Sequence, residues 1–229
     1  MPCMVTLPDG TFLIVNGAQQ GLAGFYGADN PNLSALLYDP SQPIGMRISI
    51  LNTTTIARMY HSEATLLPDA TVLISGSDPN GQMQPSIYPE ELRIEKYVPP
   101  YLTQGITQPI VTTSDTDWGY TGQYQINVKL FHGTTSSMRV SLVAATSSTH
   151  GNTMGGRIIF PECSCSGGKV CTVTSPPNSS VSPPGWYQLF ILDGPTPSNG
   201  LFIRIGGDPG RLGEWPDLPG FTLPGVGPL

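Results

Sequence analysis

Two of the three histidines in the chain stand beside residues that could help them bind a metal. Tyr60 directly precedes His61 in RMYHS, and His150 lies in the polar, glycine-containing stretch SSTHGNTMGGR. Imidazole and phenolate are good ligands for Cu(II), which prefers nitrogen and oxygen donors in a tetragonal arrangement. Adjacent residues on an extended strand point to opposite faces, so Tyr60 and His61 can share one ion only where the backbone bends, at a strand entrance.

These residue types alone are more typical of ordinary packing and hydrogen bonding than of metal binding. This holds for the Tyr60-His61 pair in a β protein and for His150 taken by itself. The third histidine, His132 in LFHGTT, is typical of a turn, and we expect no chemical role for it. Whether these residues bind a metal therefore depends on the secondary-structure elements that carry them.

An internal repeat surrounds the first site. LPDGTFLI at residues 7–14 matches LPDATVLI at residues 67–74, an offset of 67 − 7 = 60 residues. Each copy predicts a hairpin in which a Pro-Asp turn reverses one short strand into the next. Strand sets repeated at such a period are typical of β-propeller blades, which close in rings of about four to eight. Two copies predict the last blades of a propeller, over residues 1–103.

The second half of the chain has a different pattern. Residues 97–109 are rich in proline and suit a linker between domains. Short runs with interleaved polar residues follow and predict an immunoglobulin-like β-sandwich over residues 104–210. These runs are 123–130, 138–144, 157–160, 186–192 and 201–205. The Pro- and Gly-rich tail, residues 211–229, is predicted to be irregular. No window favours a helix, so the predicted fold class is all-β.

Composition excludes several partners. The net charge is −6, and the ten Lys and Arg residues are scattered, which argues against a nucleic-acid surface. No apolar run reaches the length of a membrane span. The N-terminus lacks the basic start and apolar stretch of a signal peptide, so we expect either a missing start or a cytosolic protein. The sequence sets no oligomeric state.

The cysteines and the Asn-x-Ser/Thr glycosylation signals bear on whether the protein is secreted. In an extracellular protein, the cluster of Cys163, Cys165 and Cys171 predicts one local disulfide, joining Cys171 to one of the other two. Their spacing lacks the paired C-x-x-C of a structural zinc site. Weak glycosylation signals occur at Asn32, Asn52 and Asn178.

A family resemblance gives these features a common interpretation. RMYHSEATLLPDATVLISGSDPN and PPGWYQLFILDGPTPSNGLFIRI resemble the closing half of the copper radical oxidases, the family of glyoxal oxidase and galactose oxidase. SGSDPN and NGAQQG favour the glyoxal oxidase branch. The likeness covers nearly the whole chain except its tail. It implies the last blades of a seven-bladed, kelch-like propeller followed by an early-set, immunoglobulin-like sandwich, with copper on the propeller axis.

The resemblance also assigns roles to individual residues. Tyr60 corresponds to the axial tyrosine and proton acceptor, His61 to one equatorial histidine, and His150 to the second, delivered by a sandwich loop that reaches into the propeller. In the family, a second tyrosine, bonded to a cysteine sulfur, removes a hydrogen atom from the substrate. O2 then reoxidises the site and is released as H2O2. Phe25, in GLAGFYG, is the nearest candidate for an aromatic residue of the substrate pocket. Its alternative is a surface loop in which Phe25 and Tyr26 simply pack.

The chain departs from the family pattern at the radical cofactor. The family's radical tyrosine and its cysteine belong to earlier blades, and Cys3 stands in the wrong blade for that role. We therefore expect an incomplete one-copper site and no oxidase activity from this chain alone. We expect the chain to be a fragment or a truncated gene product, and its full-length parent to be an extracellular oxidase of small aldehydes, their hydrates or alcohols that uses O2.

Two alternatives are a non-catalytic carbohydrate-binding module and a purely structural pair of β domains. Carbohydrate binding would use exposed aromatic rings on which a sugar can stack. The candidates are Trp118, Tyr120, Trp186 and Trp215. Because Trp186 lies within an apolar run, core packing is the favoured interpretation for it.

Overall fold

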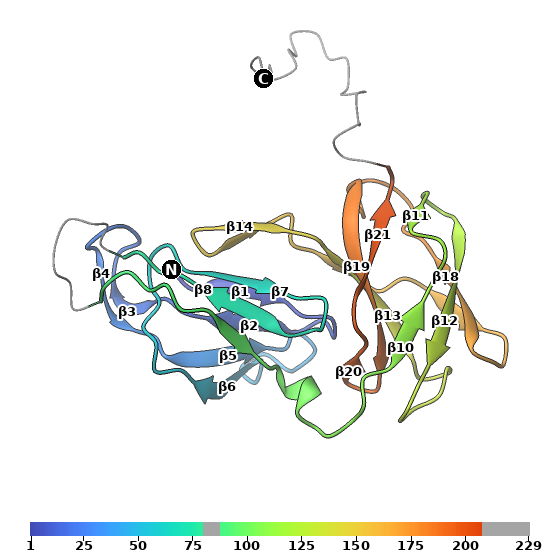
Figure 1. Cartoon of the computed structure of the whole chain (residues 1–229), viewed down its shortest axis with the longest axis horizontal. Coiled ribbons are helices and arrows are strands. Elements are labelled where there is room, and N and C mark those ends of the chain that lie inside the picture. Colours follow the sequence, from blue (N-terminus) through green and yellow to red (C-terminus); the bar gives the residue numbers. More distant parts are fainter. Residues whose placement is uncertain (80–87, 208–229) are drawn as a thin grey trace, which may run out of the picture.

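A computed structural model describes residues 1–79 and 88–207 of the chain. Within these residues the protein is built from strands, with one short 3-10 helix, η2 (Pro100–Leu102). Figure 1 shows two regions side by side, one containing β1 to β8 and the other containing β10 to β21. The all-β prediction is confirmed, as is its division into blade-type sheets and a sandwich.

The first region contains two antiparallel sheets that correspond to propeller blades. The first has the order β1-β2-β5-β6 and the second β7-β8-β9. The strands are β1 (Cys3–Thr6), β2 (Phe12–Val15), β5 (Ser34–Tyr38), β6 (Ile48–Thr53), β7 (Glu63–Leu66), β8 (Val72–Ser75) and β9 (Glu95–Tyr97). A smaller hairpin, β3 (Ala18–Gly21) with β4 (Ala28–Pro31), extends from the first sheet.

The repeated Pro-Asp-x-Thr motif forms the turns of β1–β2 and β7–β8, which confirms the two predicted hairpins. Asp9 Oδ1 accepts hydrogen bonds from the Thr11 backbone N–H at 3.0 Å and from its hydroxyl at 2.7 Å. Asp69 and Thr71 repeat the arrangement in the second copy. The aspartate therefore caps the turn, and the threonine supplies both donors.

The second region is a sandwich of two sheets. One sheet has the order β10-β12-β18-β17, and the other β11-β21-β19-β13-β16, with β20 paired to β19. The strands are β10 (Ile110–Thr112), β11 (Asp117–Trp118), β12 (Gln123–Lys129), β13 (Arg139–Ala144), β16 (Ile158–Ile159), β17 (Cys163–Cys165), β18 (Val170–Thr174), β19 (Gly185–Asp193), β20 (Thr196–Pro197) and β21 (Leu201–Ile205). The five predicted runs are β12, β13, β16, β19 and β21.

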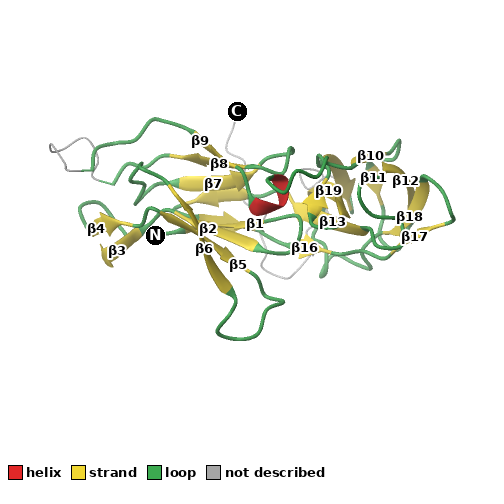
Figure 2. Ribbon diagram, turned by 90° about the horizontal axis from the view of Figure 1, so that it is seen from below, coloured by secondary structure: helices red, strands yellow, loops and turns green. Residues whose placement is uncertain are grey.

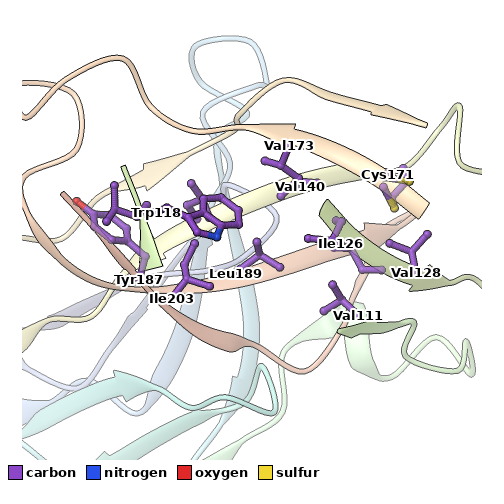
Figure 3. Packing of buried hydrophobic residues seen from close by; sticks show 14 residues of the cluster. Val111, Trp118, Ile126, Val128, Val140, Cys171, Val173, Tyr187, Leu189 and Ile203 are labelled. Atoms are coloured by element: carbon purple, nitrogen blue, oxygen red, sulfur yellow. The ribbon is translucent and has the colours of Figure 1, made fainter. Parts of the chain in front are cut away.

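Apolar side chains from both sheets fill the sandwich. Ile126 from one sheet and Leu189 and Ile203 from the other are fully buried. Figure 3 shows Leu189 and Ile203 near the Trp118 indole and Ile126 farther along the same core. A disulfide joins Cys165 to Cys171 at the β17–β18 pair, and Cys163 remains free.

The sandwich also packs against the blades. β19 is buried along nearly its whole length, because alternate residues face the sandwich core and the blades. Phe190 and Val143 share a cluster with the blade residues Val5 and Val72. The backbone N–H of Gly200 reaches the Pro68 carbonyl at 2.7 Å. Figure 2 shows η2 at this junction.

Two aromatic predictions are wrong. Trp118, offered as an exposed stacking residue, is only 2% exposed, and its ring stacks on Tyr124 with centroids 4.7 Å apart. Trp186, expected in the core, is 45% exposed because it lies near the start of β19, beyond the stretch that the blades cover. The Arg204 guanidinium lies 5.7 Å from the centre of its ring.

Other predictions concern residues at the margins of the structure. The boundary proposed at residues 103/104 falls just after η2 and remains a prediction. The tail at 211–229 and Trp215 lie outside the described residues. In the described ranges, no helix has the length and apolar character needed to cross a membrane.

Candidate metal centre

Tyr60 and His61 occupy the two central positions of a β-turn immediately before β7. The backbone N–H of Ser62 donates to the carbonyl of Met59 at 3.3 Å, and His61 has a φ of 61°. A positive φ at this position bends the chain sharply. The two adjacent rings therefore lie together, stacked with centroids 3.9 Å apart. The bend expected from the sequence is present at the strand entrance.

Hydrogen bonds to the next loop hold the turn in place. The Met59 N–H donates to Ser77 Oγ at 3.0 Å, and the Asp78 N–H donates to the Tyr60 carbonyl at 3.1 Å. The Ser62 hydroxyl, which is buried, donates to the Met59 carbonyl at 2.8 Å. The serine of RMYHS thus closes the turn from within.

Arg58, the first residue of the motif, anchors the turn from the other side. Its side chain is buried, and a buried cation requires paired and hydrogen-bonded surroundings. Its Nε lies 2.8 Å from Glu95 Oε2, and its guanidinium also donates to the backbone carbonyls of Gly76 and Arg93. Sequence reasoning missed this role, although an arginine in such a charge-poor chain was an available signal.

Cys3, on the first strand of the first blade, also contacts the turn through hydrogen bonds. Its Sγ donates to the Ser62 carbonyl at 3.2 Å and receives a hydrogen bond from Asn16 Nδ2 at 3.6 Å. Burial raises the pKa of the Cys3 thiol, which keeps it protonated and able to donate. This residue connects the first blade to the Tyr60-His61 turn.

His150 stands at the tip of a long hairpin formed by β14 (Ser147–Thr149) and β15 (Asn152–Met154). His150 and Gly151 have φ values of 55° and 74°, as a two-residue turn with two positive φ angles requires. A Cβ on Gly151 would lie 2.6 Å from the Pro2 carbonyl oxygen, so the tip is packed on the N-terminal strand. Figure 1 shows β14 extending from the sandwich towards β1 and β7.

The two histidines meet across the two regions. His61 Nε2 and His150 Nε2 are 3.1 Å apart, and the Tyr60 and His150 ring centroids are 5.4 Å apart. Metal–imidazole bonds measure about 2.0–2.1 Å for zinc, so two nitrogens bound at right angles lie about 2.9 Å apart. The observed spacing therefore fits two neighbouring positions on one tetragonal ion.

The hydroxyl of the neighbouring threonine pairs with the ring nitrogen of His150 that faces away from His61. Thr149 Oγ1 lies 2.8 Å from His150 Nδ1. When Nδ1 carries the proton and donates it to this hydroxyl, Nε2 keeps its lone pair for a metal. His150 is exposed, whereas Tyr60 and His61 are half-buried, so the group opens on one side.

Phe25 lies beside this group. It comes from the loop between β3 and β4, is 48% exposed, and contacts the rings of Tyr60 and His61 edge-on at 5.3 and 5.1 Å. The structure thus combines the two alternatives, because Phe25 belongs to a surface loop and still borders the candidate site. Its role towards a substrate remains a prediction.

His132 has a different environment. The consecutive backbone N–H groups of Phe131, His132 and Gly133 donate to the Asp193 carboxylate at 2.7, 2.8 and 2.5 Å. Burial raises the pKa of Asp193, but these bonds outweigh it and lower the pKa below its ordinary value. His132 thus belongs to a turn held by its backbone, in line with its predicted turn position.

Comparisons with known proteins match both regions. The family described as "Glyoxal oxidase N-terminus" matches residues 1–101, and "Galactose oxidase-like, Early set domain" matches residues 108–205. This order defines the class, in which blades of the glyoxal oxidase type precede an early-set sandwich.

Individual proteins are also similar to this chain over both regions. "WSC domain-containing protein" of Arthroderma benhamiae is 56% identical over 99% of this chain and 24% of the relative. "Aldehyde oxidase GLOX" of Vitis pseudoreticulata is 36% identical over 88% of this chain and 40% of the relative. A solved structure, "Novel fungal alcohol oxidase with catalytic diversity among the AA5 family, in complex with copper", has a TM-score of 0.78 and 25% identity, over 89% of this chain and 42% of the other.

The chain belongs to the family of glyoxal oxidase and galactose oxidase. It spans 24% and 40% of the length of the two relatives named above and 42% of the solved structure. The resemblance found in RMYHS and its partner stretch is therefore confirmed at the level of the family.

Proposed function

We propose that this chain supplies most of the copper site of an oxidase that converts aldehydes, or their hydrates, to carboxylic acids. The overall reaction joins an aldehyde hydrate and O2 to give the acid and H2O2. The observation that carries the proposal is the 3.1 Å approach of His61 Nε2 to His150 Nε2 beside the Tyr60 ring. The similarity to the aldehyde oxidase of Vitis pseudoreticulata favours an aldehyde over an alcohol as substrate.

Each residue of the proposed site has its own role. His61 and His150 would hold one copper ion through their Nε2 atoms, and Tyr60 would complete this part of the site with its phenolic oxygen. When bound, copper would acidify the substrate hydroxyl and exchange electrons with O2. Tyr60 Oη would accept the hydroxyl proton. Phe25 would form an apolar wall beside the substrate.

The chain alone is proposed to be inactive as an oxidase. The family reaction needs a tyrosine bonded to a cysteine sulfur, and no residue of this chain matches that pair. Cys3 is committed to the backbone beneath the Tyr60-His61 turn. The parent protein would supply the radical pair from other blades.

We also propose that the parent acts outside the cell. The Cys165–Cys171 disulfide supports this, because such bonds persist in oxidising compartments. Asn52 and Asn178 are exposed, as glycan acceptors would be. In contrast, Asn32 Nδ2 is engaged with the carbonyls of Asn16 and Ser34, at 3.3 and 2.9 Å.

Copper uptake by the full 229-residue chain tests the proposal. We expect one Cu(II) per chain by equilibrium dialysis. His61→Ala and His150→Ala should each weaken binding at least as much as the loss of an outer-shell partner does, about 10- to 100-fold. His132→Ala is the matched control, since it removes a histidine from a turn in the sandwich and should leave binding unchanged.

Two results would contradict the proposal. One is an absence of copper uptake by the unaltered chain, and the other is equal binding by all three histidine variants. Peroxide release is measured separately with glyoxal or methylglyoxal. We expect none from the copper-loaded chain, so peroxide above the buffer background would refute the incompleteness of the site.

A further inference from the structure

We propose that Glu63, Ser148 and Thr153 form a clasp that sets the position of His150 against His61. This inference rests on the copper site proposed above and assigns positioning residues to it. The clasp joins the β14–β15 hairpin of the sandwich to the first strands of both blades.

The position of the hairpin depends on its contacts with the blades, which include the packing of Gly151 against Pro2 and the hydrogen bonds of the clasp. β14 and β15 form a separate two-stranded sheet, and an isolated hairpin is only marginally stable in water. His150, at its tip, is exposed. A swing of the hairpin by a few ångströms would separate the two Nε2 atoms beyond the span of one metal ion.

The two hairpin members of the clasp are direct partners across the sheet. Ser148 lies opposite Thr153, so both side chains leave the same face of the hairpin. The Ser148 hydroxyl donates to Glu63 Oε2, on β7. The Thr153 hydroxyl donates to the Met4 carbonyl, on β1, at 2.8 Å. One pair of residues therefore holds both blades at once.

Glu63 places the β7 side of the clasp close to the site. It is the first residue of β7 and follows His61 by two positions, while Ser148 precedes His150 by two. The Ser148–Glu63 bond thus links the two histidine-bearing segments directly. A hydrogen bond to an ionised carboxylate is stronger than one between neutral groups.

The Glu63 carboxylate has no competing cation among the described residues. The ion pairs found there are Arg58–Glu95, Glu91–Arg93, Asp69–Lys96 and Asp117–Arg204. Glu63 is half-buried between the blade and the hairpin, where an unsatisfied carboxylate would be costly. The Ser148 hydroxyl therefore satisfies the Glu63 carboxylate of the blade and also holds the hairpin in position.

Hydrogen exchange in the metal-free full chain tests the clasp without copper. We expect Glu63→Ala and Ser148→Ala each to speed exchange of the amides at 147–154 by about tenfold, as loss of a hydrogen bond to a charged group would. Glu63→Gln keeps an acceptor oxygen and should restore most of the protection. The double variant should exceed neither single variant, because both remove the same bond.

Matched controls separate positioning from general stability. Glu162→Ala and Ser164→Ala remove the same residue types from exposed positions near and on β17 and should leave the hairpin unchanged. Exchange at 201–205, on β21, should stay slow in every variant that folds. If Glu63→Ala fails to fold, Ser148→Ala and Glu63→Gln carry the comparison.

Copper binding gives the second readout. We expect the dissociation constant for Cu(II) to rise about 10- to 100-fold in Glu63→Ala and to recover in Glu63→Gln. Hairpin exchange unchanged within twofold in both Glu63→Ala and Ser148→Ala would overturn the clasp. Faster exchange in a chain that takes up no copper would uphold the clasp and refute the proposed function instead.

Discussion

The sandwich and the blades enclose their apolar residues differently. The two sandwich sheets cover each other, and the blades cover much of the outer face of β13 and β19. In the first blade only one face is covered. The candidate metal centre lies where these regions meet, so its geometry depends on a well-packed unit and on an incompletely packed one.

The register of the first blade shows the uncovered face. Met4, Ile14, Leu36 and Ile50 are successive partners across β1, β2, β5 and β6, so they form one row on one face. At its ends Met4 is 51% and Ile50 76% exposed. Neighbouring propeller blades cover faces of this kind. The blades therefore depend on a further layer in a way that the sandwich does not.

Truncation of a buried leucine should show the largest difference between the regions. Leu189→Ala, in the closed sandwich core, should cost about 2–5 kcal/mol of unfolding free energy, whereas Ile50→Ala on the open face should change it by less than about 0.5 kcal/mol. Urea unfolding followed by far-ultraviolet circular dichroism, which reports on the strands of both regions, measures both. Equal losses would mean that the Ile50 row is covered in solution.

The Asp193 carboxylate gives the sandwich an acid sensitivity. Asp193→Ala leaves three backbone N–H groups without their acceptor and should cost about 1.5–3 kcal/mol. Because the folded pKa of Asp193 is lowered, its stabilisation is complete above the ordinary value of about 3.9 and is lost as pH falls through the folded pKa. Unfolding measured between pH 2 and 6 should show a shallower acid loss in the variant. Identical pH profiles would contradict this role.

A single glycine should distinguish the blade turn from ordinary loops. A Cβ on Gly76 would lie 2.5 Å from the His61 carbonyl oxygen, so Gly76→Ala should displace the turn, cost about 1–3 kcal/mol and weaken copper binding. Gly105→Ala is the matched control. Its φ of 74° is nearly the same as the 73° of Gly76, but nothing lies within 4 Å of its Cβ. Similar copper affinities in the two variants would refute the packing argument.

The smallest effect on stability is expected on the open face itself. Replacing Ile48 and Ile50, which are 60% and 76% exposed, with threonine keeps β-branched side chains on β6. We expect little change in unfolding free energy and less self-association, measured by light scattering. A loss above about 1 kcal/mol would show that these residues pack in solution.

The sequence predicted what local patterns encode. The Pro-Asp turns specify the two blade hairpins, and alternating runs specify β12, β13, β19 and β21. The bend at Tyr60 and His61 was also predictable, because adjacent residues on an extended strand point to opposite faces, and the glycine-containing stretch around His150 indicated a loop. Their role as ligands came from the family resemblance and remains a proposal.

Long-range packing accounts for what the sequence did not predict. Trp118 is buried because the two-residue strand β11 pairs with distant β21, a contact that no local pattern announces. Trp186 is exposed because the cover over β19 ends before it. Likewise, the supports of the site, Arg58 and Cys3, act through partners from other segments.

The most direct test of the central claim is electron paramagnetic resonance of Cu(II) bound to the full chain. If His61 and His150 bind one ion through Nε2, the spectrum will show coupling to two imidazole nitrogens. In His150→Ala or His61→Ala the spectrum will show coupling to one imidazole nitrogen, and in His132→Ala it will still show coupling to two. A two-nitrogen pattern that persists in His61→Ala and His150→Ala alike would contradict the site.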